Sequence, residues 1–189
     1  MKWIMAAMMS ACVVAQTLGA GIRECLRKMG ETDLAVSASD TNGVSFRFTI
    51  LPTWGNPVCV RVQQEGKTLR LIAKRLEGQA GYEVGKLVEM NERVLSEEDS
   101  TKLLRGLGRV HFFEMQPTKP DEAGYDGESW YLEGIRHGQS HSVERWSADY
   151  EAKKRVLDEF VKFCTLLVMS ADLKEPPNNK GREIFGRKK

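Results

Sequence analysis

Glu133, His137 and His141 follow one another at intervals of four residues and are the clearest candidates for chemistry in this chain. Imidazole gains and loses a proton near neutral pH and is also a common metal ligand. A carboxylate beside two histidines can act as an acid/base pair or hold a divalent metal ion in an open site. This reading predicts a metal-assisted or acid/base hydrolase, with His141 and Glu133 as catalytic groups and His137 and His141 as metal ligands. The His-Glu-x-x-His order of zinc hydrolases is absent.

The same stretch is rich in aromatic and guanidinium side chains, which protein interfaces favour. The candidate binding residues are Trp130, Tyr131, Arg136, Arg145 and Trp146. Trp54 and Tyr82, in predicted loops, extend this hypothesis. In the competing interpretation, the two tryptophans of the stretch pack a sheet against a helix and Arg145 pairs with a carboxylate.

No obvious nucleophile accompanies the histidines. The chain has no Gly-x-Ser-x-Gly motif, and Cys59 and Cys164 stand in apolar sequence surroundings, where thiols are usually inert. It also lacks the Cys-x-x-Cys pair that often holds structural zinc. The sequence therefore predicts no cofactor and favours a non-enzymatic binding module over the hydrolase.

The stretch itself is predicted to be a β-hairpin. Residues 129–136 and 141–146 alternate in the manner of strands and are rich in aromatic and β-branched side chains. Between them, residues 137–140 are short and contain glycine, as hairpin loops do. Asp126 and Gly127 provide a turn signal just before the first strand.

Two segments of this hairpin carry a pattern: Asp-Gly-x-x-Trp-x-Leu-Glu-Gly at 126–134 and Gly-x-x-His-x-Val-x-Arg-Trp-Ser at 138–147. The pattern resembles that of a group of uncharacterised exported bacterial proteins. The resemblance implies a small exported α+β protein, and it implies no activity.

The remaining elements follow from hydrophobic periodicity. Strands are predicted at 44–51, 58–63 and 68–76, with further strands at 86–91 and 110–115. Helices are predicted at 21–30, from Ser96 to Gly106 or Gly108, and from Ser147 or Asp149 to about Ala171. Short connections between the first three strands favour an antiparallel meander.

The predicted fold class is therefore α+β. An antiparallel sheet of roughly five to seven strands would carry the long C-terminal helix on one face, together with a shorter helix. The chain has 189 residues, 41% of them hydrophobic, which is enough for one substantial core. Its net charge of +2 indicates no strong attraction to nucleic acid.

The N-terminus has the layout of a secretory signal peptide. Lys2 is followed by an apolar run from Trp3 to Ala15, with possible cleavage after Ala15 or Ala20. A buried first helix, a lipid anchor on Cys12 and a retained membrane anchor are the alternatives. Cleavage would leave three cysteines, which allow at most one disulfide: Cys25, Cys59 and Cys164.

These features predict a leader or anchor at 1–20, one α+β domain at 21–173 and a basic flexible tail at 174–189. The expected location is periplasmic or secreted, and the expected partner is a protein or another component of the cell envelope. Membrane contact is expected only through the N-terminal segment or the basic tail.

Overall fold

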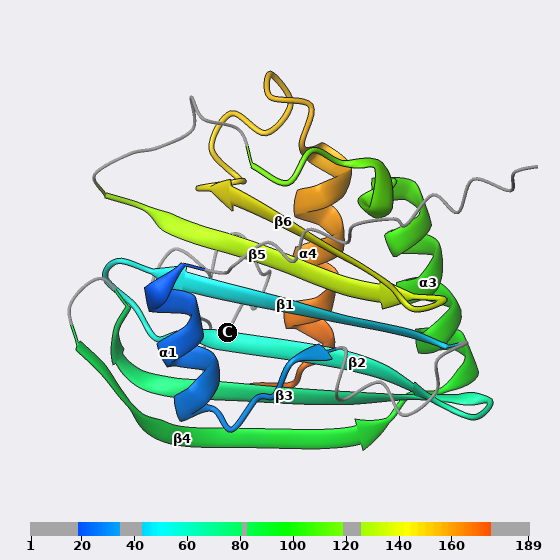
Figure 1. Cartoon of the computed structure of the whole chain (residues 1–189), viewed down its shortest axis with the longest axis horizontal. Coiled ribbons are helices and arrows are strands. Elements are labelled where there is room, and N and C mark those ends of the chain that lie inside the picture. Colours follow the sequence, from blue (N-terminus) through cyan, green and yellow to red (C-terminus); the bar gives the residue numbers. More distant parts are fainter. Residues whose placement is uncertain (1–18, 35–42, 81–82, 119–125, 175–189) are drawn as a thin grey trace, which may run out of the picture.

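The computed structural model describes residues 19–34, 43–80, 83–118 and 126–174. Their centre is a six-stranded antiparallel sheet with the order β4-β3-β2-β1-β5-β6 (Figure 1). The elements, in chain order, are α1 (Ala20–Lys28), β1 (Val44–Pro52), β2 (Val58–Glu65), β3 (Thr68–Gln79), β4 (Glu83–Val94), α3 (Glu97–Val110), the 3-10 helix η1 (Phe112–Glu114), β5 (Glu128–Arg136), β6 (Gln139–Trp146) and α4 (Asp158–Ser170). The structure confirms the predicted α+β class and the antiparallel sheet.

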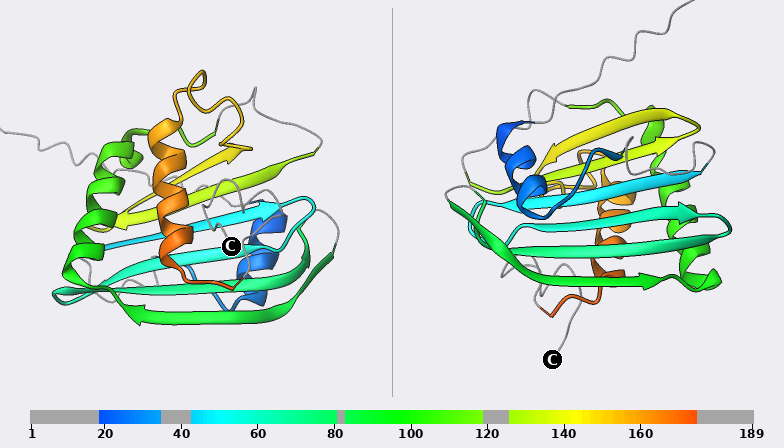
Figure 2. Two further views of the ribbon diagram at one scale, coloured as in Figure 1. Left: turned by 180° about the vertical axis from the view of Figure 1, so that it is seen from behind. Right: turned by 60° about the horizontal axis from the view of Figure 1, so that its bottom comes forward.

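Helices lie on both faces of the sheet. Figure 2 shows α3 and α4 side by side on one face and α1 on the other. The α3/α4 face holds the main core, because alternate residues of the strands point toward these helices. Trp130 of β5 is fully buried there, with its ring centroid 5.3 Å from that of Phe48 and 6.4 Å from that of Phe160. On the α1 face, a smaller apolar cluster joins the helix to the sheet: Ile22, Cys25, Leu26, Met29, Cys59 and Leu76.

Helix α3 begins as predicted and ends later. The Ser96 side chain accepts a hydrogen bond of 3.0 Å from the backbone N–H of Asp99, which caps the helix. The helix continues through Gly106 because this glycine is a contact point with α4: a Cβ atom there would lie 2.8 Å from Cδ2 of Phe163. A strand at 110–115 was the wrong prediction. These residues end α3 and form η1, which places Phe112 in the main core.

The prediction of a long C-terminal helix is also wrong. Helix α4 has 13 residues, Asp158–Ser170, and the segment before it forms turns. In that segment, Arg155 donates hydrogen bonds to the backbone carbonyls of Trp146, Ser147 and Tyr150, at 2.9, 2.7 and 2.9 Å. The guanidinium group thus satisfies carbonyls that a helix would have used in its own ladder.

The hairpin of β5 and β6 is present, with a tighter turn than predicted. Arg136 pairs with Gln139, so the turn consists of His137 and Gly138. Both have positive φ angles, 51° and 74°, which suits the twist of a two-residue hairpin turn. No helix in the described ranges combines the length and apolarity needed to cross a bilayer. Residues 1–18 of the predicted leader, Tyr82 and the basic tail from 175 onward lie outside these ranges.

Candidate functional site

The hairpin residues predicted to bind a partner divide between the two faces of the sheet. Trp130 and Arg145 point into the α3/α4 face, where both side chains are buried. The indole N–H of Trp130 donates to Glu128 Oε1 at 2.7 Å. Arg145 donates to the backbone carbonyls of Gln116 and Pro117, at 2.6 and 3.1 Å, and ties that segment to β6. These two residues belong to the interior of the domain.

Tyr131 and Trp146 lie on the α1 face, and each is half-buried. The hydroxyl of Tyr131 donates to Glu144 Oε1 at 2.7 Å. Burial and this hydrogen bond both raise the pKa of Tyr131 above its ordinary value. Arg136 stands at the hairpin turn instead, with its guanidinium carbon 4.3 Å from the ring centroid of Phe113. The five predicted residues therefore do not form one surface.

The structure does not assemble the predicted acid/base or metal site. Glu133 pairs across the hairpin with Ser142, whereas His141 pairs with Gly134, and adjacent positions on a strand face opposite sides. His141 packs against Phe112, and its Nε2 atom lies 2.9 Å from the carbonyl oxygen of Met115. His137 is exposed in the turn. Among the described residues, no three His, Cys, Asp or Glu side chains are grouped so that they could hold a metal ion.

Glu133 instead takes part in a buried group of charges on the α1 face. We name this group, made of Glu31, Arg47, Arg61, Lys74 and Glu133, the Glu31 cluster. Both carboxylate oxygens of Glu133 accept from Arg47, at 2.9 Å from Nε and 3.1 Å from an amino nitrogen. Glu31, whose side chain is 1% exposed, accepts from Lys74 at 2.6 Å, from Arg61 at 2.9 Å and from Arg47 at 3.4 Å.

Strand register brings these charges together. Arg47 of β1 pairs directly with Arg61 of β2 on one side and with Glu133 of β5 on the other. Glu31 arrives from the chain that follows α1, where Gly30 adopts a left-handed φ of 64°. The backbone N–H of Glu31 donates to the carbonyl of Leu26 at 2.8 Å, which closes the end of the helix. The turn at Gly30 therefore directs Glu31 onto the sheet.

The charged groups of the cluster are stabilised by direct contact with one another. Burial lowers the pKa of the Arg47 guanidinium, but Glu133 and Glu31 outweigh burial, so the net shift is upward and Arg47 stays charged. Cys59 lies among the same side chains. Burial, followed by Glu31, raises the pKa of its thiol to about 12. The thiol is therefore protonated at neutral pH and unsuited to nucleophilic attack.

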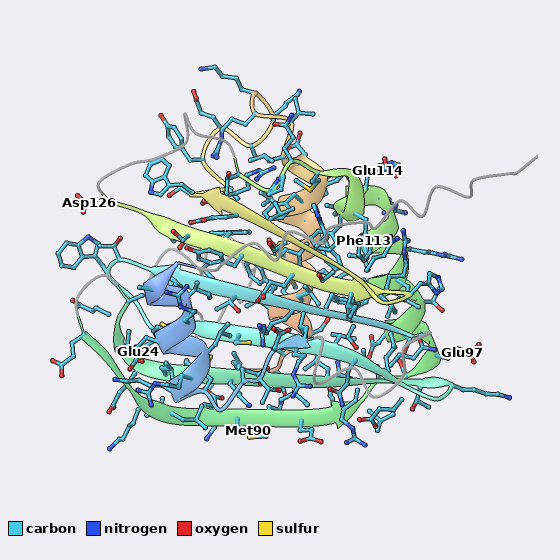
Figure 3. All side chains as sticks on the ribbon, viewed as in Figure 1. Glu24, Met90, Glu97, Phe113, Glu114 and Asp126 are labelled. Carbon is cyan, nitrogen blue, oxygen red and sulfur yellow. The ribbon has the colours of Figure 1, made fainter. Side chains whose placement is uncertain are left out.

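A second feature lies where three chain segments meet at Gly127. We name the aromatic residues of these segments the aromatic end: Trp54, Trp146 and Tyr150. A Cβ atom on Gly127 would lie 2.8 Å from the Trp146 ring and 2.4 Å from Ser147 Oγ. Gly127 also accepts a hydrogen bond of 2.8 Å from the N–H of Thr53, the neighbour of Trp54. Trp54 is 58% exposed and Tyr150 is 61% exposed. Figure 3 shows Asp126, beside Gly127, at the opposite end of the sheet from Phe113 and Glu114.

Sequence reasoning found part of this arrangement and missed the rest. Trp54 and Trp146 were singled out for their type and predicted loop or strand setting. The Glu31 cluster was missed because Glu31 begins a polar segment that resembles an ordinary loop. One signal was present: Arg47 and Arg61 each lie within a predicted strand, on the face opposite its alternating phenylalanine or valine side chains.

The comparisons with known proteins add no assignment to this geometry. No protein-family model matches the chain, and no curated protein matches it in sequence.

Proposed function

We propose that this chain is an exported, non-enzymatic binding module that contacts its partner through the aromatic end. The observation that carries the proposal is the exposure of Trp54 and Tyr150, which belong to chain segments that meet at Gly127. Large aromatic side chains supply much contact area for little loss of conformational freedom, and binding interfaces concentrate them.

The loop that holds Tyr150 supports the same proposal. It has three non-glycine residues with positive φ, namely Ser147 at 37°, Glu151 at 48° and Val156 at 58°. A left-handed conformation is costly for a β-branched residue, and Val156 is also 88% exposed. Strained backbone positions of this kind cluster at functional sites.

We infer export from the N-terminal sequence pattern, and a separate experiment tests this inference. The protein would be purified, untagged, from the periplasmic or secreted fraction of its native host, and its mass determined intact. We expect a mass that begins after Ala15 or Ala20. Recovery of the full chain from the cytosol would contradict export and leave the binding proposal to be tested separately.

Partner binding is tested by capture from the same fraction on immobilised protein, followed by cross-linking and mass spectrometry. The variant Trp54→Ala/Tyr150→Ala removes the two most exposed aromatic residues of the aromatic end. The matched control is Met169→Ala, because Met169 is a 55% exposed apolar residue on α4. We expect a partner that the wild type and the control retain and the double variant loses. Equal capture by all three proteins would refute the aromatic end as the binding surface.

A further inference from the structure

The Glu31 cluster contains three cationic side chains and two carboxylates, so one positive charge is in excess. Glu133 is committed to Arg47 through two hydrogen bonds. Glu31 is therefore the only carboxylate that Lys74 and Arg61 share within the cluster, at 2.6 and 2.9 Å. If Glu31 left, three cations and one carboxylate would remain beneath α1. Buried charges of one sign are strongly unfavourable, so this site requires an anion whenever it is closed.

The contacts of Glu31 are those of a bound carboxylate ligand. One oxygen accepts from Lys74 and the other from Arg61 and Arg47, so each oxygen has at least one charged donor. The donors come from β3, β2 and β1, which pair with one another in the sheet. They are therefore held by the sheet independently of the helix that brings Glu31. Charge-assisted hydrogen bonds from a rigid scaffold are a common way to recognise carboxylates.

Helix α1, which delivers Glu31, contributes no residue to the main core. Its buried apolar residues belong to the small cluster on the α1 face, whereas Phe46, Phe48 and Trp130 pack on the other side. The helix has nine residues, and isolated helices of this length are unstable in water. Its outer side is charged: Glu24 is paired with Arg27 at 2.7 Å in the exposed position. Regions with few buried contacts open at lower free energy than the global core.

We propose that Arg47, Arg61 and Lys74 form a binding site for a carboxylate of an acidic peptide, and that Glu31 fills this site as an internal competitor. When α1 leaves the sheet, the carboxylate of the ligand takes the place of Glu31. A carboxylate in place of Glu31 restores the native charge of the cluster and offers two oxygens to the donors that Glu31 now contacts. This site is separate from the aromatic end and does not depend on the proposed function.

Three cysteines supply an internal readout in the wild-type protein. Cys25 lies on α1 and Cys59 beneath it, whereas Cys164 lies on α4 in the main core, and all three are buried and free. The rate at which a thiol reagent labels each cysteine would be measured by peptide mass spectrometry. The probes are a short poly-glutamate peptide, phosphate, and chloride at equal ionic strength. We expect poly-glutamate to accelerate labelling of Cys25 and Cys59 by about fivefold or more and to leave Cys164 unchanged.

Two results would overturn the proposal. If the three cysteines react at one rate whatever the anion, α1 leaves only when the whole domain unfolds, and Glu31 is a fixed structural residue. If phosphate accelerates Cys25 as much as poly-glutamate does, the site has no preference for carboxylates.

A variant tests the site itself. In Glu31→Ala, we expect acetate to raise the melting temperature by more than chloride does at equal ionic strength, because acetate can fill the vacated position. The control Glu24→Ala removes a carboxylate from the exposed side of the same helix. It should respond equally to the two anions. An equal response of Glu31→Ala to acetate and chloride would contradict the anion site. If Glu31→Ala does not fold, the cysteine labelling of the wild type still tests the proposal.

Discussion

Glu133 and His141 lie on opposite faces of the hairpin formed by β5 and β6. Glu133 pairs across with Ser142 and is held by Arg47, whereas His141 pairs with Gly134 and packs against Phe112. Their sequence spacing suits one face of a helix, but across a hairpin with a two-residue turn the residues that share a face are an odd number of positions apart. The tight turn at His137 and Gly138 sets the register that separates them.

His141 is therefore expected to act in packing. We expect His141→Ala to lower the free energy of unfolding by about 1–3 kcal/mol, because it removes the contact with Phe112 and the polar contact with the Met115 carbonyl. His137→Ala, in the exposed turn, should change stability by about 0.5 kcal/mol. Urea denaturation of both variants measures the difference. Stoichiometric metal in the wild type that disappears in both variants would restore the hydrolase hypothesis.

The fold was predictable to the extent that each element depends on its own sequence. Strand β1 alternates between apolar and polar residues over most of its length, and Ser96 with its acidic neighbours marks the start of α3, so these features needed no tertiary information. The turns before α4 depend on a side-chain contact, in which Arg155 binds the carbonyls of Trp146, Ser147 and Tyr150. Nothing in the local pattern indicates that contact.

The Glu31 cluster also could not be predicted from the local sequence pattern. Alternation places Arg47, Arg61 and Lys74 on one face of their strands, and that much is readable from the sequence. Their common partner is Glu31, which reaches them only because α1 packs across the sheet and Gly30 turns the chain back. A single sequence records neither the strand register nor the docking of that helix.

Alanine substitutions at Gly106 and Gly108, both in α3, test the packing of α3 against α4. Gly106→Ala would place a Cβ atom 2.8 Å from the Phe163 ring, and overpacking of this kind costs about 1–3 kcal/mol. A Cβ atom on Gly108 would have no neighbour within 4 Å. Gly108→Ala should therefore stabilise the protein by about 0.5–1 kcal/mol through its higher helix propensity. Thermal unfolding of the two variants measures whether one is destabilised and the other stabilised. Equal changes in stability would contradict the close approach of the two helices at Gly106.

Replacement of Trp130 and replacement of Trp54 are expected to have different effects on stability. Trp130 is fully buried among Phe48, Phe160 and the rest of the main core, so Trp130→Ala should cost about 3–5 kcal/mol and reduce the yield of folded protein. Trp54, which is 58% exposed, is expected to tolerate replacement by Ala with a change of about 0.5 kcal/mol. Far-UV and near-UV circular dichroism with urea titration distinguishes the two outcomes. A folded, fully stable Trp130→Ala variant would show that this indole is not part of the core.

The buried thiols predict how stability depends on alkaline pH. Burial raises the pKa of Cys25 from 9.0 to about 11 and that of Cys59 from 9.0 to about 12. Because the folded-state values are higher, each thiol holds its proton more tightly in the folded protein than in the unfolded chain. Their contribution to stability is fully present below pH 9.0 and is lost as the pH rises toward about 11 and 12. We expect the free energy of unfolding, measured in urea under reducing conditions, to fall over this range, and to fall less steeply in Cys59→Ala than in the wild type. An identical slope in the two proteins would show that Cys59 is already accessible to solvent in the folded state.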